Sequence, residues 1–227
     1  MLYSIIIPIY NEKRTIKFLL DDLKPLINQF EVIVIDDGST DGGEIYLNDA
    51  KGIKLITNKI NLGKGSSIIK GIEIAKGENI ILADGDFEVK INDVHKLINA
   101  FESRNRDGAV VGKRWDALYK KNFKVIDIGN YVLNTFFNFI YDSKMNDILC
   151  CFKLVPKKIL KKINLNSKRF SIETEIMSKL ILNEISVKEV KVNYNRRTKK
   201  EGKKIKYSDS FDIISTMIKT RFSSYRN

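Results

Sequence analysis

The chain has 227 residues, of which 43% are hydrophobic, and this is enough to bury one substantial core without division into separate domains. It carries 40 lysines and arginines against 28 acidic residues, so its net charge of +12 attracts polyanions such as nucleic acid, anionic lipid or phosphorylated substrates. The only two cysteines, Cys150 and Cys151, are adjacent, which argues against a disulfide framework and favours a reducing compartment.

The first residues run into an apolar segment without the basic stretch and cleavage site of a signal peptide. No apolar run approaches the roughly 18 residues that a membrane-spanning helix needs. We therefore expect a cytoplasmic protein, either soluble or attached peripherally to the cytoplasmic face of a membrane.

Short apolar runs in the first half of the chain predict strands that are covered on both faces. These runs are residues 2–7, 31–35, 53–57 and 79–83. Helical segments are expected between them, at 12–27 and 66–75, with a turn after Thr40. Strands that alternate with helices predict an α/β fold with a Rossmann-like, mostly parallel sheet flanked by helices.

The pattern is weaker beyond about residue 110. Helices are expected at 125–140, 171–182 and 209–222, and a short strand at 187–192. The last helix has apolar residues at helical spacing, so it can pack on the core or lie in a membrane interface. We find no internal repeat or low-complexity linker, which predicts a single domain over residues 1–227.

Three of the first four predicted strands end in acidic loops. These loops contain Glu12, Asp36 and the pair Asp84 and Asp86. Loops at the carboxyl ends of parallel strands converge on the ligand crevice, where neighbouring carboxylates repel unless a cation lies among them. Hard oxygen ligands from Asp84 and Asp86, with Glu88 as a third, predict Mg²⁺ or Mn²⁺; the alternative is a solvated turn.

Asp36 and Asp37 could accept hydrogen bonds from ribose hydroxyls or from a base, and Asp36 is the better candidate. Asp41 and Glu44 have the spacing of a capping box at the start of the next helix.

The segment 61–66 suggests a phosphate-binding loop, but Asn58 stands where the first glycine is required and Gly65 where Ser or Thr is required. Lys64 remains as a lysine between glycines at a helix start, where free amides and the helix dipole could favour a diphosphate; a simple turn is the alternative. Gly71 is expected to permit close helix packing and Gly77 to cap the helix.

Taken together, these segments resemble the family 2 glycosyltransferases of the GT-A fold. The branch that they resemble most contains dolichyl-phosphate mannose synthase and bacterial polyprenyl-phosphate sugar transferases. The similarity covers nearly the whole chain and rests on segments 8–12, 36–42, 61–65, 71–77, 84–86, 112–114, 147–153, 169–175 and 194–205.

The resemblance implies that residues 1–110 bind the nucleotide sugar, and that residues 111–227, including the last helix, bind the acceptor. The residues implied to hold the nucleoside are Pro8, Tyr10, Glu12 and Asp36. Those implied to hold a metal on the diphosphate are Asp84, Asp86 and Glu88, with Lys64 nearby.

The implied reaction is an inverting displacement that moves a mannose- or glucose-type sugar from a GDP- or UDP-linked donor to a lipid phosphate. Charge accumulates on the leaving diphosphate, so cations can stabilise the transition state. The candidate catalytic residues are Asp86, Arg114, Arg197 and Lys204. A hydroxyl acceptor in a surface glycan is the alternative; it would need a general base, for which Asp147 is the candidate unless that residue is structural.

The basic charge alone would also permit a nucleic-acid-binding protein. The sequence has no helix-turn-helix, zinc or aromatic-sheet signature, so we expect no nucleic acid partner. Attachment to an anionic membrane is expected to come from the last helix, the basic charge, or a partner, which would be a membrane protein or a second copy of the chain.

Overall fold

The strands of the protein form one seven-stranded sheet in the computed structural model, which describes residues 2–115, 125–197 and 209–223. The strands in chain order are β1 (Tyr3–Ile9), β2 (Glu31–Asp36), β3 (Ile53–Thr57), β4 (Asn79–Leu82), β5 (Ala109–Lys113), β6 (Lys153–Pro156) and β7 (Val187–Lys191). Their spatial order is β3-β2-β1-β4-β6-β5-β7. All pairs are parallel except those of β6, which runs antiparallel to both neighbours.

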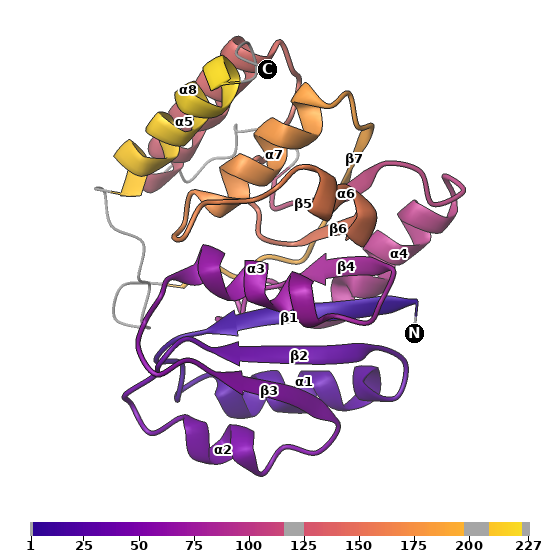
Figure 1. Ribbon diagram of the computed structural model, residues 1–227, viewed down its shortest axis with the longest axis vertical. Coiled ribbons are helices and arrows are strands. Elements are labelled where there is room, and N and C mark those ends of the chain that lie inside the picture. Colours follow the sequence, from indigo (N-terminus) through magenta and orange to yellow (C-terminus); the bar gives the residue numbers. More distant parts are fainter. Residues whose placement is uncertain (1, 116–124, 198–208, 224–227) are drawn as a thin grey trace.

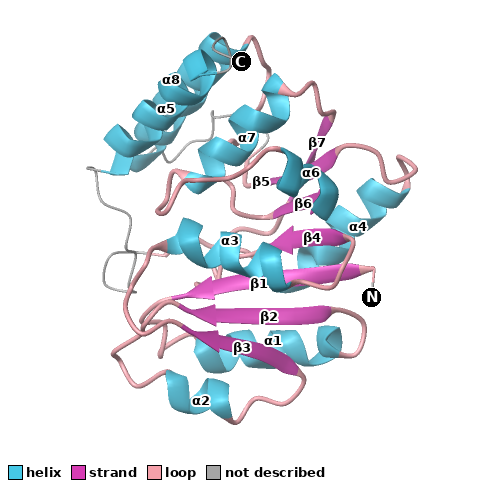
Figure 2. Ribbon diagram, viewed as in Figure 1, coloured by secondary structure: helices cyan, strands magenta, loops and turns pink. Residues whose placement is uncertain are grey.

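Helices cover both faces of this sheet (Figure 2). They are α1 (Ile16–Ile27), α2 (Glu44–Asn48), α3 (Lys64–Ile74), α4 (Val94–Glu102), α5 (Val125–Tyr141), α6 (Lys157–Lys162), α7 (Ile172–Leu182) and α8 (Asp209–Ser223), with a short 3-10 helix, η1, at Ile91–Asp93. The predicted α/β class with a mostly parallel sheet is confirmed.

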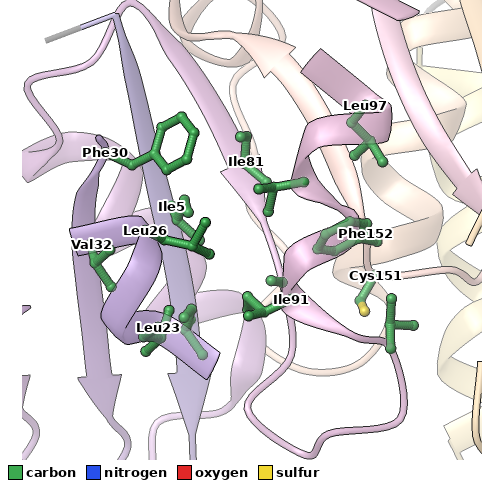
Figure 3. Close-up of a cluster of buried hydrophobic side chains, with 14 of the residues drawn as sticks. Ile5, Leu23, Leu26, Phe30, Val32, Ile81, Ile91, Leu97, Cys151 and Phe152 are labelled. Carbon is green, nitrogen blue, oxygen red and sulfur yellow. The ribbon is translucent and has the colours of Figure 1, made fainter. Parts of the chain in front are cut away.

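The central strands are mostly apolar because each face of the sheet meets its own core. On β1, Ile5 and Ile7 belong to the core beneath α1 and α4, whereas Ile6 between them belongs to the core beneath α3 and α7. Figure 3 shows part of the first core, where Leu23 of α1 and Phe152 approach the sheet from different segments of the chain. The edge strands β3 and β7 are only partly buried.

The four strands predicted in the first half are present, but β5 and β6 were not predicted. β6 is hard to recognise as a strand from its sequence because it begins with a lysine, Lys153, and ends with a proline, Pro156. Lys153 is nevertheless fully buried. Charged residues and prolines are rare inside strands, so the local pattern argued against a strand here.

The helices predicted in the second half are also present, as α5, α7 and α8. Figure 1 shows α5 and α8 side by side at the end of the molecule remote from α2. The hydroxyl of Tyr141 on α5 donates a hydrogen bond to the carbonyl of Met217 on α8 at 2.7 Å. Within the described residues, no helix combines the length and apolar character needed to cross a bilayer.

The predictions made for Gly71 and Gly77 have different outcomes. A Cβ on Gly71 of α3 would lie 2.5 Å from Ile6 Cγ2, so the predicted close packing of this helix on the sheet is confirmed. Gly77 does not cap the helix, since α3 ends at Ile74 with Ala75 as its C-cap. A Cβ there would lie 2.5 Å from Ser4 Oγ, so Gly77 instead lets the chain pass close to β1.

This packing predicts opposite effects for two glycine-to-alanine changes in helices. Gly71→Ala is expected to lower the free energy of unfolding by ~1–3 kcal/mol because the added methyl overpacks the contact with Ile6. Gly129→Ala on α5, where an added Cβ meets nothing within 4 Å, is the matched control. It is expected to raise stability by ~0.5–1 kcal/mol because alanine favours the helix. Urea unfolding measures both, and equal effects would contradict the close contact.

Candidate active site

The acidic loops after β1, β2 and β4 converge at one edge of the sheet, as predicted. Arg197 joins two of them, since its Nη1 donates to Glu12 Oε2 at 2.9 Å and to the carbonyl oxygen of Asp86 at 3.0 Å. The loops after β1 and β2 are joined by Asn11, whose amide N–H donates to Ser39 Oγ at 2.8 Å. The edge therefore brings Glu12, Asp36 and Asp86 into one region.

Asp36 and Asp37 follow each other in the chain but have different partners. Asp36 is buried at the end of β2 and accepts hydrogen bonds from the amide and the hydroxyl of Ser39 at 3.0 and 2.5 Å. Asp37 accepts from the amides of Leu62 and Gly63 at 3.0 and 2.8 Å, so it holds the loop that leads into α3. Asp37 is thereby assigned a structural role.

The predicted capping box at Asp41 is wrong. Helix α2 begins at Glu44 with Gly43 as its N-cap, and no side chain caps it. The carboxylate of Asp41 instead accepts from the amides of Lys13 at 2.8 Å and Gly43 at 3.0 Å. Asp41 therefore ties the loop after β1 to the loop after β2.

Asp84 and Asp86 lie just beyond β4 and crowd each other electrostatically. Removal from water, followed by the charges of Asp84 and Glu88, raises the pKa of Asp86 to about 7. Asp86 Oδ1 accepts from the amide of Glu88 at 3.0 Å, which only partly offsets this repulsion. Two hard oxygen donors side by side, one of them in a position that disfavours its own charge, fit a divalent cation.

Both carboxylate oxygens of Glu88, the third predicted metal ligand, accept hydrogen bonds within the protein. Its Oε1 accepts from the amide of Arg197 at 3.0 Å and its Oε2 from the hydroxyl of Tyr194 at 3.2 Å. In the described part of the chain, no three His, Cys, Asp or Glu side chains form a group that could hold a metal. Asp84 and Asp86 remain as candidate ligands, a number that suits an ion shared with a diphosphate.

Lys64, the first residue of α3, reaches into this acidic region. Its Nζ lies 2.7 Å from Asp84 Oδ1 and 2.8 Å from Glu173 Oε1. Burial lowers the pKa of Lys64, but the charges of Asp84 and Glu173 outweigh it and hold that pKa well above the usual range. Lys64 is therefore charged and lies next to the proposed metal ligands.

One amide at the start of α3, where the sequence suggested an anion site, is already engaged within the protein. The amide of Ser66 donates to the carbonyl oxygen of Lys168 at 3.1 Å. A Cβ on Gly65 would lie 1.9 Å from the carbonyl oxygen of Ser167, so these glycines let the segment 167–168 cover the first turn. At this helix start it is the Lys64 side chain, and not the Ser66 amide, that is directed to the acidic region.

Arg114 and Asp147 form a buried pair. Asp147 is 3% exposed, and both of its oxygens accept hydrogen bonds from the Arg114 guanidinium at 2.8 Å. The guanidinium also lies 4.4 Å from the ring centre of Trp115 and 5.3 Å from that of Tyr194. Both Asp147 oxygens are already engaged, which favours the structural alternative for this residue over a free general base.

Pro8, Tyr10 and Lys204 are the remaining predicted site residues. Pro8 is half-buried within β1, and Tyr10 is half-buried just after it. Lys204 lies outside the described residues.

Sequence reasoning assigned no role to Glu173 and Lys153. Glu173 lies on α7, and its Oε2 is 2.5 Å from Lys153 Nζ at the start of β6. Lys153 also donates to the carbonyl oxygen of Cys150. The available signal was a lysine inside the apolar segment 150–155, because a charged residue in such a segment needs a buried partner.

Comparison with known proteins gives a consistent set of relatives. The family model described as Glycosyl transferase family 2 matches residues 4–164. A dolichyl-phosphate beta-glucosyltransferase of Dictyostelium discoideum is 27% identical, covering 96% of this chain and 73% of the relative. A dodecaprenyl-phosphate galacturonate synthase of Rhizobium johnstonii is 25% identical, covering 71% of this chain and 50% of the relative.

The fold has solved counterparts. Glucosyl-3-phosphoglycerate synthase from Mycobacterium tuberculosis, crystallised with Mn²⁺, uridine diphosphate and phosphoglyceric acid, matches with a TM-score of 0.75 and 17% identity. The match covers 97% of this chain and 78% of that structure. At this identity the likeness concerns the fold.

Proposed function

Because the chain belongs to glycosyl transferase family 2, we propose that it is an inverting enzyme that moves a glucose- or mannose-type sugar from a nucleotide-diphosphate donor to a polyprenyl or dolichyl phosphate. The observation that carries this proposal is the meeting of Asp84, Asp86, Lys64 and Arg197 at the carboxyl edge of the parallel strands. The relatives named for transfer to dolichyl and dodecaprenyl phosphates support the acceptor class.

The donor side of the site is assigned to the first half of the chain. Asp84 and Asp86 would hold Mg²⁺ or Mn²⁺, which neutralises charge on the departing diphosphate when it is bound. Lys64, and Arg197 from the second half of the chain, add positive charge in the same region, where it stabilises the leaving group. Pro8, Tyr10, Glu12 and Asp36 are assigned to the nucleoside.

The acceptor side is assigned to residues 111–227. A lipid phosphate attacks through an oxygen that is already anionic, so the reaction needs no general base. A hydroxyl acceptor would need one, and the paired state of Asp147 leaves it poorly placed for that role. The geometry of this pair therefore favours the phosphate acceptor.

The test is transfer from radiolabelled UDP-glucose and GDP-mannose to polyprenyl phosphate in detergent, with and without Mn²⁺. We expect metal-dependent formation of an organic-extractable sugar lipid from one of the donors, and loss of that product when EDTA removes the ion. Transfer to a soluble sugar with none to the lipid would replace the proposed acceptor with a glycan hydroxyl.

We place the peripheral contact with an anionic membrane on α5 and α8. Ile128, Val132 and Phe139 form an exposed stripe on α5, and Phe211 and Phe222 are exposed on α8. The other sides of these helices are already packed against the protein, in the core beneath α3 and α7. An apolar stripe on a basic protein fits the interface of an anionic bilayer.

Substitution in these stripes is expected to weaken membrane binding. Phe139 is 85% exposed and Phe211 is 76% exposed, so their replacement by serine removes little from the core. The loss of each ring from the bilayer costs ~1.5 kcal/mol or more, which is about a tenfold loss of affinity. Sedimentation with phosphatidylserine vesicles measures this effect, and Phe18→Ser on α1, where Phe18 is 61% exposed, is the matched control. Equal binding of all three variants would exclude this face.

A further inference from the structure

A chain of alternating charges runs from the acidic region into the core. Asp84 is paired with Lys64, Lys64 with Glu173, and Glu173 with Lys153, at separations of 2.7, 2.8 and 2.5 Å. These four groups come from the loop after β4, from α3, from α7 and from β6. Exposure falls along the chain, from 28% for the Asp84 side chain to 0% for that of Lys153.

We infer that Lys64 is the resident counter-ion of Asp84, that a divalent ion must displace it, and that Glu173 is a positioning residue which retains the displaced ammonium in the site. This inference rests on the proposed use of Asp84 as a metal ligand. The ammonium lies 2.7 Å from Asp84 Oδ1, where it neutralises the carboxylate that would hold the ion. Two cations cannot share that oxygen without strong repulsion.

Glu173 is suited to retaining the ammonium. It is 4% exposed, and its two oxygens face two different lysines. Burial raises the pKa of Glu173, but the charges of Lys153 and then Lys64 outweigh it and hold that pKa below the usual range. Because Lys153 is fully buried and fixed, Glu173 keeps one partner when Lys64 shifts its contact away from Asp84.

The contact between Lys64 and Glu173 is a close ion pair. Among the described residues, Glu173 Oε1 has no aligned hydrogen-bond partner although the ammonium is 2.8 Å away. An ion pair of this kind tolerates a change in direction better than a hydrogen bond does. Lys64 can therefore leave Asp84 for a diphosphate while it stays next to Glu173.

This arrangement couples the ion to the nucleotide. An ion that binds alone must break the Lys64–Asp84 pair. When a diphosphate arrives with the ion, the diphosphate gives Lys64 a new anionic partner. The two ligands are therefore expected to bind cooperatively, and Lys64 is the residue through which they are coupled.

The test is the affinity for Mn²⁺, measured by electron paramagnetic resonance of the free ion, without nucleotide and with UDP or GDP. Lys64→Met is expected to bind Mn²⁺ alone roughly fivefold or more tightly than the unaltered protein, and to lose most of the gain in Mn²⁺ affinity that the nucleotide gives. Lys70→Met is the matched control, because Lys70 lies on the same helix but donates to Asn58 Oδ1 at 2.7 Å. It is expected to change neither value.

Glu173→Gln tests the positioning role. It is expected to weaken binding of Mn²⁺ with nucleotide, while Glu173→Asp, which keeps the charge, restores part of it. If burial of Lys153 beside the neutral glutamine unfolds the protein, Glu173→Asp still tests the positioning role, because it keeps the charge beside Lys153, and Lys64→Met still decides the counter-ion role.

The outcomes separate the inference from the proposed function. Unchanged Mn²⁺ affinity in Lys64→Met, together with nucleotide-dependent Mn²⁺ binding by the unaltered protein, would overturn the counter-ion role and leave the function standing. Absence of nucleotide-dependent Mn²⁺ binding in the unaltered protein would count against the function itself.

Discussion

Asp86→Asn is expected to lower kcat/KM for sugar transfer by about a hundredfold to a thousandfold, the usual loss when one group that stabilises transition-state charge is removed. The asparagine keeps the shape of the side chain but removes the charge that would hold the cation. It also removes a charge that burial, and then the charges of Asp84 and Glu88, disfavour, as the raised pKa of Asp86 indicates. The unfolding midpoint of the metal-free protein is therefore expected to rise while activity falls.

Initial rates with saturating lipid acceptor and thermal unfolding measure the two effects. Asp107→Asn is the control, because Asp107 is an exposed acid that directly precedes Gly108 and β5, at the amino end of that strand. It removes the same charge at the opposite edge of the sheet and is expected to change neither quantity. An Asp86→Asn variant with full activity would remove Asp86 from the site.

Asp147→Ala is expected to destabilise the protein by ~3–5 kcal/mol, because it leaves the Arg114 guanidinium buried without its partner. Burial lowers the pKa of Arg114, but Asp147 more than offsets this, so the arginine stays charged in the folded protein. A loss of this size is a large part of the ~5–15 kcal/mol that stabilises a typical domain. Urea unfolding with an unchanged m-value measures it.

The double variant Arg114→Leu, Asp147→Leu is the informative control. Since replacing both members of a buried pair with apolar residues is often neutral, it is expected to recover much of the stability that Asp147→Ala loses. If Asp147→Asn instead kept full stability and lost transfer, Asp147 would be a general base, and the acceptor would be a hydroxyl.

The part of the site that follows β1, β2 and β4 could be predicted because each piece has a local signal. An apolar run marks each strand, and the rule that ligands bind beyond the carboxyl ends of parallel strands places the acids together. These two signals alone were enough to place Asp84 and Asp86 at the crevice. The same reasoning identified Lys64 at the start of a helix.

Other parts depend on contacts between distant segments, which one sequence does not encode locally. Arg114 and Asp147 are separated by 33 positions and meet only because β5 lies next to β6. The capping box failed because Asp41 is drawn to the amide of Lys13, which belongs to another loop. β6 was not predicted because a charged residue such as Lys153 is rare in a buried strand. Its charge is neutralised by Glu173, which lies twenty positions further along the chain.

The reversed direction of β6 determines which segment of the second half lies beside the acidic loop after β4. Lys153, at the start of β6, pairs in register with Leu82, at the end of β4, so the segment that enters β6 arrives where the acid-bearing segment leaves β4. Arg114 and Arg197 follow the ends of β5 and β7, so of the seven strands that the structure describes only β6 has its beginning on the side of the crevice. On the proposed assignment of residues 111–227 to the acceptor, a segment of the acceptor half therefore lies directly beside the loop that carries Asp84 and Asp86.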